Sequence, residues 1–372
     1  MKTHLKILSF VLISVILSTG LHNLCYAQEK EKGLEIRALL LGAPDSEDLQ
    51  LFNKFIREAL PEEGVNVLVV RFRYKYQFES YPELADEGAL SKKEVKQILQ
   101  ACKDAGVKLI PKMNFLGHQS SGTKVSPLLT EYPEFDETLH FEPPDPYVWP
   151  NEHDFYCKSY CPSHPDLHKV LFSLMDELIE VCEADAFHVG MDEVFYLADS
   201  KCPRCSGRDK AELYAEEVTR LFNHLKGKNI TMWMWGDRFL DGKTTGLGMW
   251  QASMNNTYKA IDLVPKDIMI CDWHYNEAPP TPAYFALKGF NVLACPYTDA
   301  DVALSQLEHI NQVRNSSNKQ IATRLKGVFH TSWSNAKGFI QAYYGEDVKE
   351  NDKNCAECFK KLFSEIRNNS DK

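Results

Sequence analysis

Two adjacent carboxylates, Asp192 and Glu193, follow a short apolar run that ends at Gly190. Carboxyl groups at the end of a buried strand can exchange protons with a substrate, because burial and a neighbouring charge shift their pKa. A solvated acidic loop is the alternative, and it would account for many Asp-Glu pairs. The pair is therefore a candidate acid–base centre, and the residues around it decide how well this interpretation is supported.

Other polar and aromatic residues lie near the ends of further apolar runs. In chain order they are Arg37, His118, Trp235, Asp237, Trp273, Tyr297, Asp299 and Trp333. A single tryptophan is more often a core residue than a binding residue, but core packing explains poorly why three of them stand at run ends. His188 lies inside a run, and we interpret it as a buried histidine without a catalytic role. The set predicts a ring of side chains around one opening.

The elements that would position this ring alternate regularly along the chain. Short apolar runs predict strands at Glu35–Gly42, Val65–Phe72, Val107–Met113, Ala186–Gly190, Ile230–Trp235, Ile268–Trp273, Val292–Cys295 and Gly327–Thr331. Amphipathic stretches predict helices at Leu49–Leu60, Lys92–Ala105, Pro165–Cys182, Lys210–Lys226, Ala283–Leu287 and Asp301–Val313. Continuously apolar strands are typical of a parallel sheet covered on both faces. Eight such units predict an α/β fold, the TIM (β/α)8 barrel, whose active site lies at the carboxyl ends of the strands.

The chain has 372 residues, and 44% of them are hydrophobic, which suffices for a large core. We find no Pro/Gly/Ser-rich linker and therefore predict one domain over residues 28–372. The longest irregular stretch, Ser120 to His164, follows the third strand. We expect it to wall the site, although a surface excursion is the alternative.

The net charge bears on nucleic-acid binding, and the N-terminal residues bear on the cellular location of the protein. A net charge of -10 provides no basic field for a phosphate backbone, so we expect no nucleic-acid partner. Lys2 and Lys6, the apolar run Leu8 to Leu17 and the small-residue site ending at Ala27 predict a signal peptide over residues 1–27. We expect export to the periplasm or secretion, with no transmembrane segment after signal removal. An uncleaved anchor and a lipid anchor at Cys25 are the alternatives.

Several segments carry a resemblance to a known family. Residues 187–194, FHVGMDEV, resemble the fourth-strand signature of glycoside hydrolase family 20, the β-N-acetylhexosaminidases. The likeness extends over nearly all of residues 33–345, in the family's order, through Ile110–His118, Cys161-Pro162, Tyr297-Thr298-Asp299 and Ser332-Trp333-Ser334. The sequence departs from the family at Met191, where a glycine is usual, and at Ser334-Asn335, where a glutamate is usual. The end of strand two, Arg71 to Tyr76, lacks the family's His and Asp.

The resemblance implies a glycosidase that removes terminal β-linked N-acetylhexosamine, GlcNAc or GalNAc, from an oligosaccharide or glycoconjugate. The implied mechanism is substrate-assisted and retaining and needs no cofactor, so we expect none. It makes Glu193 the general acid and then base, and Asp192 the residue that holds the acetamido N–H. The remaining implied roles are Tyr297 at the acetamido oxygen, His118 supporting the acidic pair, Arg37 and Asp299 at sugar hydroxyls, and Trp235, Trp273 and Trp333 around the sugar.

Three alternatives remain open from the sequence: a glycosidase of other specificity, a carbohydrate-binding barrel without turnover, and a metal-dependent hydrolase. The binding barrel would be favoured by loss of Glu193, which is present. A metal-dependent hydrolase should show several histidine and aspartate ligands at strand ends. Only His118 and Asp192 are candidates for that role.

Ten of the eleven cysteines lie after the predicted signal peptide. Close-spaced pairs occur at Cys157/Cys161, Cys202/Cys205 and Cys355/Cys358, whereas Cys102, Cys182, Cys271 and Cys295 fit buried small hydrophobes. Loops after the third and fourth strands carry the first two pairs. Their four sulfurs could form one tetrahedral zinc site, but export favours disulfides instead.

Overall fold

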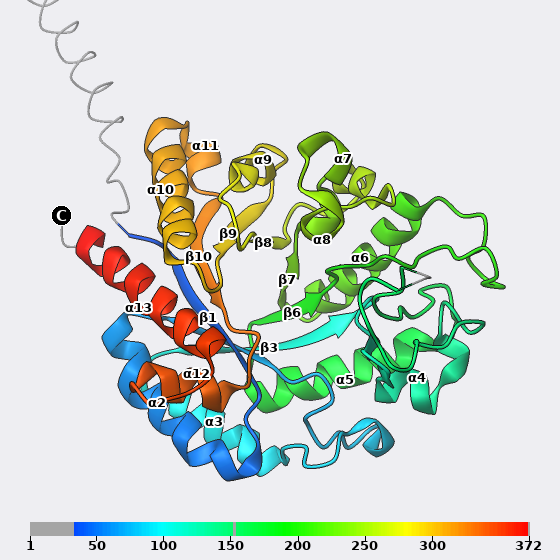
Figure 1. Ribbon diagram of the computed structural model, residues 1–372, viewed down its shortest axis with the longest axis horizontal. Helices are drawn as coiled ribbons and strands as arrows, with labels where there is room; N and C mark the ends of the chain where they lie inside the picture. Colours follow the sequence, from blue (N-terminus) through cyan, green and yellow to red (C-terminus); the bar gives the residue numbers. More distant parts are fainter. Residues whose placement is uncertain (1–32, 152–153, 371–372) are drawn as a thin grey trace, which may run out of the picture.

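The computed structural model describes residues 33–151 and 154–370, and the predicted signal peptide with Cys25 lies outside the described residues. Eight parallel strands close into a barrel in the order β1-β10-β9-β8-β7-β6-β3-β2 (Figure 1). Their bounds are β1 Ile36–Gly42, β2 Val67–Arg71, β3 Lys108–Phe115, β6 Ala186–Gly190, β7 Thr231–Trp235, β8 Met269–Trp273, β9 Asn291–Cys295 and β10 Leu325–Thr331. All eight predicted strands are confirmed to within two residues, and with them the TIM barrel.

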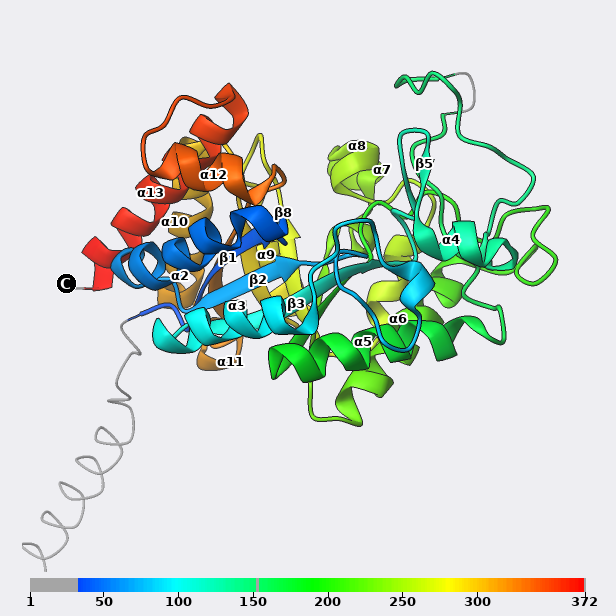
Figure 2. The same ribbon diagram turned by 90° about the horizontal axis from the view of Figure 1, so that it is seen from below.

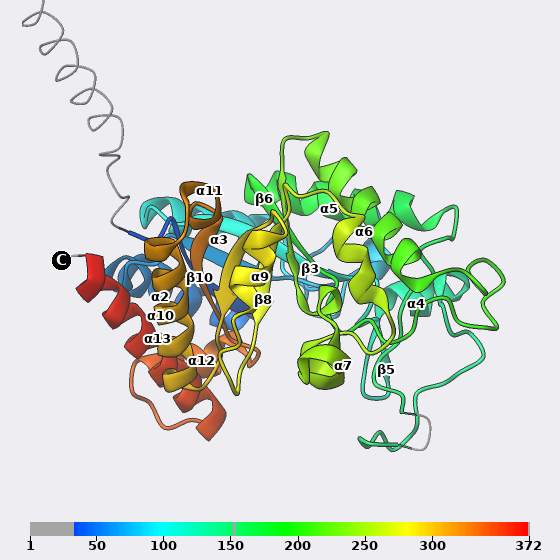
Figure 3. The same cartoon turned by 90° about the horizontal axis from the view of Figure 1, so that it is seen from above.

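Helices surround the barrel and pack on the outer faces of the strands (Figure 3). The six predicted helices are confirmed as α2 Leu49–Glu63, α3 Lys92–Asp104, α5 Leu167–Cys182, α6 Lys210–Lys226, α9 Thr281–Leu287 and α10 Ala300–Ser316. Shorter helices are α4 Pro127–Glu131, α7 Gly242–Thr245, α8 Gly248–Gln251, α11 Lys319–Ala322 and α12 Ala336–Tyr343. The C-terminal helix α13, Glu350–Ser370, packs against α2, α10 and α12.

The inside of the barrel is filled by every second residue of the strands, because successive side chains of a strand point to opposite faces. Ala38 and Leu40 of β1, for example, share one buried cluster with Val67 and Val69 of β2. Three tryptophans lie in the same cluster, at Trp233, Trp235 and Trp273. The odd-numbered residues of β1 therefore face the surrounding helices, which decides the position of Arg37 below.

The loops after β3 and β6 lie together at one end of the molecule, beside α4 and β5 (Figure 2). The first loop contains the short hairpin of β4, Ser120–Ser121, and β5, Lys124–Val125. β3 and β6 are neighbours in the barrel, and their register shifts between Lys112 and Phe115. This irregularity lies directly before the loop that carries His118. Among the described residues, no helix combines the length and apolar character needed to span a bilayer.

Candidate active site

Asp192 and Glu193 converge on one imidazole nitrogen at the carboxyl ends of β3 and β6. Nε2 of His118 lies 3.1 Å from Oδ2 of Asp192 and 3.3 Å from Oε2 of Glu193. The side chains of His118 and Glu193 are each 13% exposed, so this group is largely shielded from solvent. The structure thus brings together three of the residues that the sequence predicted to act together.

The charges within this group oppose the effect of burial. Burial alone lowers the pKa of His118, but the Asp192 carboxylate and Cys157 outweigh it and raise the pKa well above its usual value. Burial raises the pKa of Asp192, but the hydrogen bond and charge of His118, with a smaller contribution from Lys112, bring it well below its usual value. His118 and Asp192 therefore form an ion pair at neutral pH.

The backbone around the acidic pair adopts conformations that side chains rarely take. Met191 has a φ of 73° and Glu193 a φ of 49°, both in the left-handed region. A left-handed backbone conformation at such a residue costs about 1–3 kcal/mol of conformational free energy, and it persists only where the surrounding structure holds it. The hydroxyl of Tyr214 on α6 donates to the Met191 carbonyl at 2.8 Å. The family's usual glycine at this position is therefore explained by the turn, which Met191 makes at a cost in strain.

A hydrogen bond to the loop after β7 also holds the backbone of Glu193 in place. The Glu193 backbone N–H donates to Oδ2 of Asp237 at 3.0 Å, and Nε of Arg238 donates to the same oxygen at 2.6 Å. Burial raises the pKa of Asp237 to about 6, although the Arg238 charge acts against it. Asp237 thus positions Glu193 through its backbone.

Gly117 allows the loop after β3 to lie directly on the acidic pair. A Cβ at Gly117 would lie 3.0 Å from the Asp192 carbonyl oxygen and 3.3 Å from Cγ2 of Val194. Both distances are shorter than ordinary contacts, so a side chain here would push the two loops apart. The position of His118 against Asp192 depends on this close approach.

An aromatic cluster packs beside the acidic pair. The Tyr156 side chain hydrogen-bonds Glu193, and burial together with the Glu193 charge raises the Tyr156 pKa. Its ring centroid lies 5.8 Å from that of His118, 5.5 Å from that of Phe195 and 4.8 Å from that of Trp250. Tyr156 belongs to the irregular stretch 120–164, which confirms the prediction that this segment walls the site.

Another wall is formed at the ends of β2, β8, β9 and β10. Trp333 donates through Nε1 to the Tyr275 hydroxyl at 2.7 Å, and the Arg71 guanidinium lies 5.3 Å from the centre of the Trp333 ring. Burial lowers the Arg71 pKa to about 10, while the charges of Asp192, Tyr297 and Tyr275 raise it. The Tyr275 and Tyr297 rings are 5.3 Å apart. Arg71 is thus the cation of this wall.

Tyr297, Trp273 and Trp333 lie at the predicted end of the barrel, whereas Trp235 does not offer a binding surface. Trp235 is fully buried and stacks on Phe329 at 5.6 Å with the ring planes 4° apart. It is a packing residue beneath Trp333, so its predicted contact with a ligand is corrected. Trp273 is 9% exposed, and its Nε1 has no partner among the described residues.

The prediction for Arg37 is wrong, whereas the contact of Asp299 with a sugar hydroxyl stays a prediction. Arg37 faces away from the barrel interior, near the amino end of β1, where it donates to the carbonyls of Gly64 at 2.7 Å and Leu34 at 2.6 Å. Asp299 is exposed and caps helix α10 by accepting the N–H groups of residues 301 and 302. Arg37 thus stabilises the amino end of β1, outside the group that surrounds Asp192, and Asp299 uses Oδ1 to cap α10.

Three residues of the site were not singled out from the sequence. Arg71 had a signal, because it continues the inward-facing alternation of Val67 and Val69. Tyr275 follows β8 by two residues and continues the alternation of Cys271 and Trp273 in the same way. Tyr156 had none, since no periodicity places one residue of a long irregular segment against Glu193.

The cysteines are arranged differently from either sequence-based hypothesis. None of the ten described cysteines forms a disulfide. Cys157 hydrogen-bonds His118, so it does not join the other three loop cysteines, which cluster with Glu137 instead. Cys355 and Cys358 are buried one turn apart on α13. The predicted four-sulfur set is corrected on this point.

The profile of "Glycosyl hydrolase family 20, catalytic domain" matches residues 72–362, which include β3 to β10 and the acidic pair. The chain belongs to glycosyl hydrolase family 20. A beta-hexosaminidase of Akkermansia muciniphila is 29% identical over 132 residues, which are 35% of this chain and 25% of that protein.

Solved structures share the fold of this chain. A chitobiase of Flavobacterium johnsoniae superposes with a TM-score of 0.60 at 16% identity, covering 91% of this chain and 52% of the other. A beta-N-acetylhexosaminidase of Bacteroides fragilis gives 0.54 at 16% identity, covering 80% and 61%. At such identities the likeness concerns the fold. This family 20 chain spans only part of the length of these relatives.

Proposed function

We propose that this family 20 protein hydrolyses terminal β-linked N-acetylhexosaminides by substrate-assisted, retaining catalysis. One observation carries the proposal: Asp192 and Glu193 both contact Nε2 of His118. An ordinary retaining glycosidase needs two carboxyl groups about 5–5.5 Å apart on opposite sides of the anomeric carbon. Asp192 and Glu193 share one imidazole nitrogen, and their nearest oxygens lie within 4.8 Å of each other, which is closer together than this arrangement requires. The 2-acetamido oxygen of the substrate would then serve as the nucleophile.

The first step makes and breaks one bond at the anomeric carbon. Glu193 gives its proton to the leaving oxygen as the glycosidic bond breaks, and the acetamido oxygen bonds to the anomeric carbon to give an oxazolinium ring. Tyr156 already hydrogen-bonds Glu193 and would stabilise the carboxylate that forms. Glu193 then takes a proton from the water that opens the ring, which restores the acetamido group with retained configuration.

Asp192 is suited to the positive charge that develops on the acetamido group. His118 engages its Oδ2, whereas Oδ1 is buried without a hydrogen-bond partner among the described residues. A buried carboxylate oxygen of this kind can accept the acetamido N–H, and its charge favours the oxazolinium over the neutral amide. Tyr297 would hydrogen-bond the acetamido oxygen.

Sugar hydroxyls and the sugar face would meet the wall formed by Arg71, Trp273 and Trp333. Arg71 supplies a guanidinium for hydroxyl groups, in the role that the sequence assigned to Arg37. The proposed partner is an oligosaccharide or glycoconjugate, and we propose export of the protein from the features of residues 1–27. The names of the hexosaminidase and chitobiase relatives support an N-acetylhexosamine substrate.

Rates on aryl β-GlcNAc, aryl β-GalNAc and aryl β-glucoside, measured side by side, test the proposal. We expect turnover of one or both acetamido sugars, competitive inhibition by a thiazoline mimic of the oxazolinium, and poor turnover of the glucoside. Efficient cleavage of the glucoside would contradict substrate assistance. No turnover of any of the three would contradict the proposed activity on terminal sugars.

A further inference from the structure

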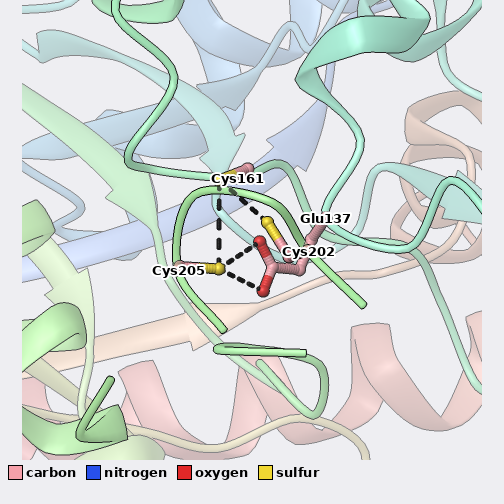
Figure 4. Close-up of side chains that lie close together, drawn as sticks. All are labelled: Glu137, Cys161, Cys202 and Cys205. Atoms are coloured by element: carbon pink, nitrogen blue, oxygen red, sulfur yellow. Dashed lines mark hydrogen bonds between the residues drawn. The ribbon is translucent and has the colours of Figure 1, made fainter. Parts of the chain in front are cut away.

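A second cluster of reactive side chains lies between the loops that follow β3 and β6 (Figure 4). It consists of Glu137, Cys161, Cys202 and Cys205, which the proposed chemistry does not use. Their ligand atoms all lie within 4.8 Å of one another, and all four residues are buried. Figure 4 shows the three sulfurs and the carboxylate turned toward a common centre.

The charge of Glu137 is not balanced by any described side chain. Glu137 is 1% exposed, and no lysine, arginine or histidine of residues 33–151 or 154–370 is recorded within 4.0 Å of its carboxylate. A buried carboxylate without a cation costs several kcal/mol. Both of its oxygens lie near Cys205 Sγ, at 2.8 and 3.0 Å, but one thiol has only one proton to donate. Among the described residues, Glu137 therefore has no ion-pair partner, since Lys158 pairs with Asp136 and His140 lies beside Asp199.

The distances between the sulfurs match a metal centre better than a disulfide. Cys161 Sγ lies 3.5 Å from Cys202 Sγ and 4.0 Å from Cys205 Sγ. Zn–S bonds of about 2.3 Å at tetrahedral angles separate two sulfurs by roughly 3.8 Å. A disulfide requires about 2.05 Å and would join only two of the three sulfurs.

Backbone N–H groups hold the sulfurs of Cys161 and Cys202 in place. N–H groups of Arg204 and Cys205 hydrogen-bond the sulfur of Cys202, and the N–H of Ser163 hydrogen-bonds the sulfur of Cys161. Cysteine binds metal as the thiolate, and hydrogen bonds to the ligating sulfurs hold these ligands in place. The N–H of Asp199 fixes Glu137 Oε1 in the same way, at 2.8 Å.

We propose that Glu137, Cys161, Cys202 and Cys205 bind one structural Zn²⁺ ion. Three thiolates and a carboxylate complete the four ligands of a closed tetrahedral zinc site. Glu137 and Cys161 come from the segment after β3, whereas Cys202 and Cys205 come from the loop after β6. The ion would join the two loops that carry Tyr156 and Glu193, and it would do so at a distance from the reacting atoms.

The first test is metal analysis of the full chain purified without chelator or added metal. We expect about one zinc per chain, released by an organomercurial that titrates thiols, with a lower Tm after release. The X-ray absorption spectrum at the zinc edge should fit three sulfur ligands near 2.3 Å and one oxygen ligand near 2.0 Å. Absence of zinc, with Cys161 linked to Cys202 or Cys205 by a disulfide in peptide mapping, would overturn the proposal. A four-sulfur spectrum would overturn the role of Glu137.

Variants then assign the ligands. Cys205→Ser and Glu137→Gln should reduce bound zinc at least tenfold after dialysis against a weak chelator, since each removes one ligand. Cys102→Ser is the matched control, because Cys102 is equally buried and lies on α3, away from the cluster. Zinc content in both ligand variants equal to that of Cys102→Ser would overturn the assignment. If a ligand variant does not fold, the wild-type stoichiometry and spectrum still decide the question.

Discussion

The backbone N–H of Glu193 donates to the side chain of Asp237 at 3.0 Å, which ties the end of β6 to the loop after β7. The Glu193 side chain is thereby free to reach His118 and Tyr156. Arg238 holds the accepting oxygen of Asp237 in place from the same loop. The position of the proposed acid is thus fixed by a neighbouring strand end as well as by its own.

Glu193→Gln removes the proton that the proposed acid transfers and leaves the shape of the site nearly unchanged. General acid catalysis contributes about 10²–10⁴-fold, so we expect kcat on aryl β-GlcNAc to fall by that factor. The Tm should change little. Glu308→Gln on the exposed face of α10 is the control and should keep the wild-type rate. A wild-type rate in Glu193→Gln would show that another group is the acid.

Asp192→Asn should weaken the stabilisation of the oxazolinium. Removing one preorganised electrostatic contact costs about 10²–10³-fold in kcat, and the thiazoline mimic should bind correspondingly more weakly. The His118 pKa should also fall, because burial lowers it and the Asp192 charge that outweighs burial is lost. NMR titration of the imidazole measures this shift. An unchanged His118 pKa would contradict the ion pair.

Arg71 and Arg37 form a matched pair for testing the corrected role. Arg71→Met should raise KM on aryl β-GlcNAc roughly 10- to 100-fold, since hydrogen bonds to charged groups contribute about 1.5–3 kcal/mol. Arg37→Met should leave KM unchanged but lower stability by about 1–2 kcal/mol, because the carbonyls of Gly64 and Leu34 lose their donor. Kinetics and urea denaturation of both variants measure these effects. A raised KM in Arg37→Met together with an unchanged KM in Arg71→Met would contradict the corrected role of Arg71.

The fold could be predicted from sequence because strands buried on both faces leave continuous apolar runs that need no tertiary information. The acidic pair and His118 could be predicted because each directly follows such a run. The role of Arg37 was implied by the family resemblance, whereas the alternation along β1 sends its side chain outward. Asp299 precedes a helical pattern, and an aspartate in that place is a typical N-cap.

The remaining features depend on long-range packing. Glu137 and Tyr156 lie in the irregular segment after β3, where no period relates sequence position to direction. Each contacts a residue of the loop after β6: Glu137 contacts Cys205, and Tyr156 contacts Glu193. Contacts of this kind follow from how two loops pack against each other, which the residues of either loop alone do not determine.

Lys112 carries a buried amine in the barrel interior, and its environment opposes the charge. The residue is fully buried, its Nζ donates to Asn114 Oδ1, and it lies 5.6 Å from the centre of the Trp235 ring. Burial lowers its pKa to about 7 from an ordinary value of 10.5, with Arg71 and Arg73 acting in the same direction and Asp192 against it. The folded protein therefore binds fewer protons than the unfolded chain between these two values.

Stability should for this reason rise with pH above about pH 7. Below the folded pKa of Lys112 the penalty for burying the charge is fully present, and it declines as the pH rises toward the unfolded value. Lys112→Met keeps the volume and removes the charge, so it should be more stable than wild type at pH 6. Its advantage should shrink by about 2 kcal/mol between pH 7 and pH 9, since one pKa unit corresponds to 1.36 kcal/mol. Urea denaturation of both proteins across this range measures the difference, and a pH-independent difference would show that Lys112 does not change its protonation there.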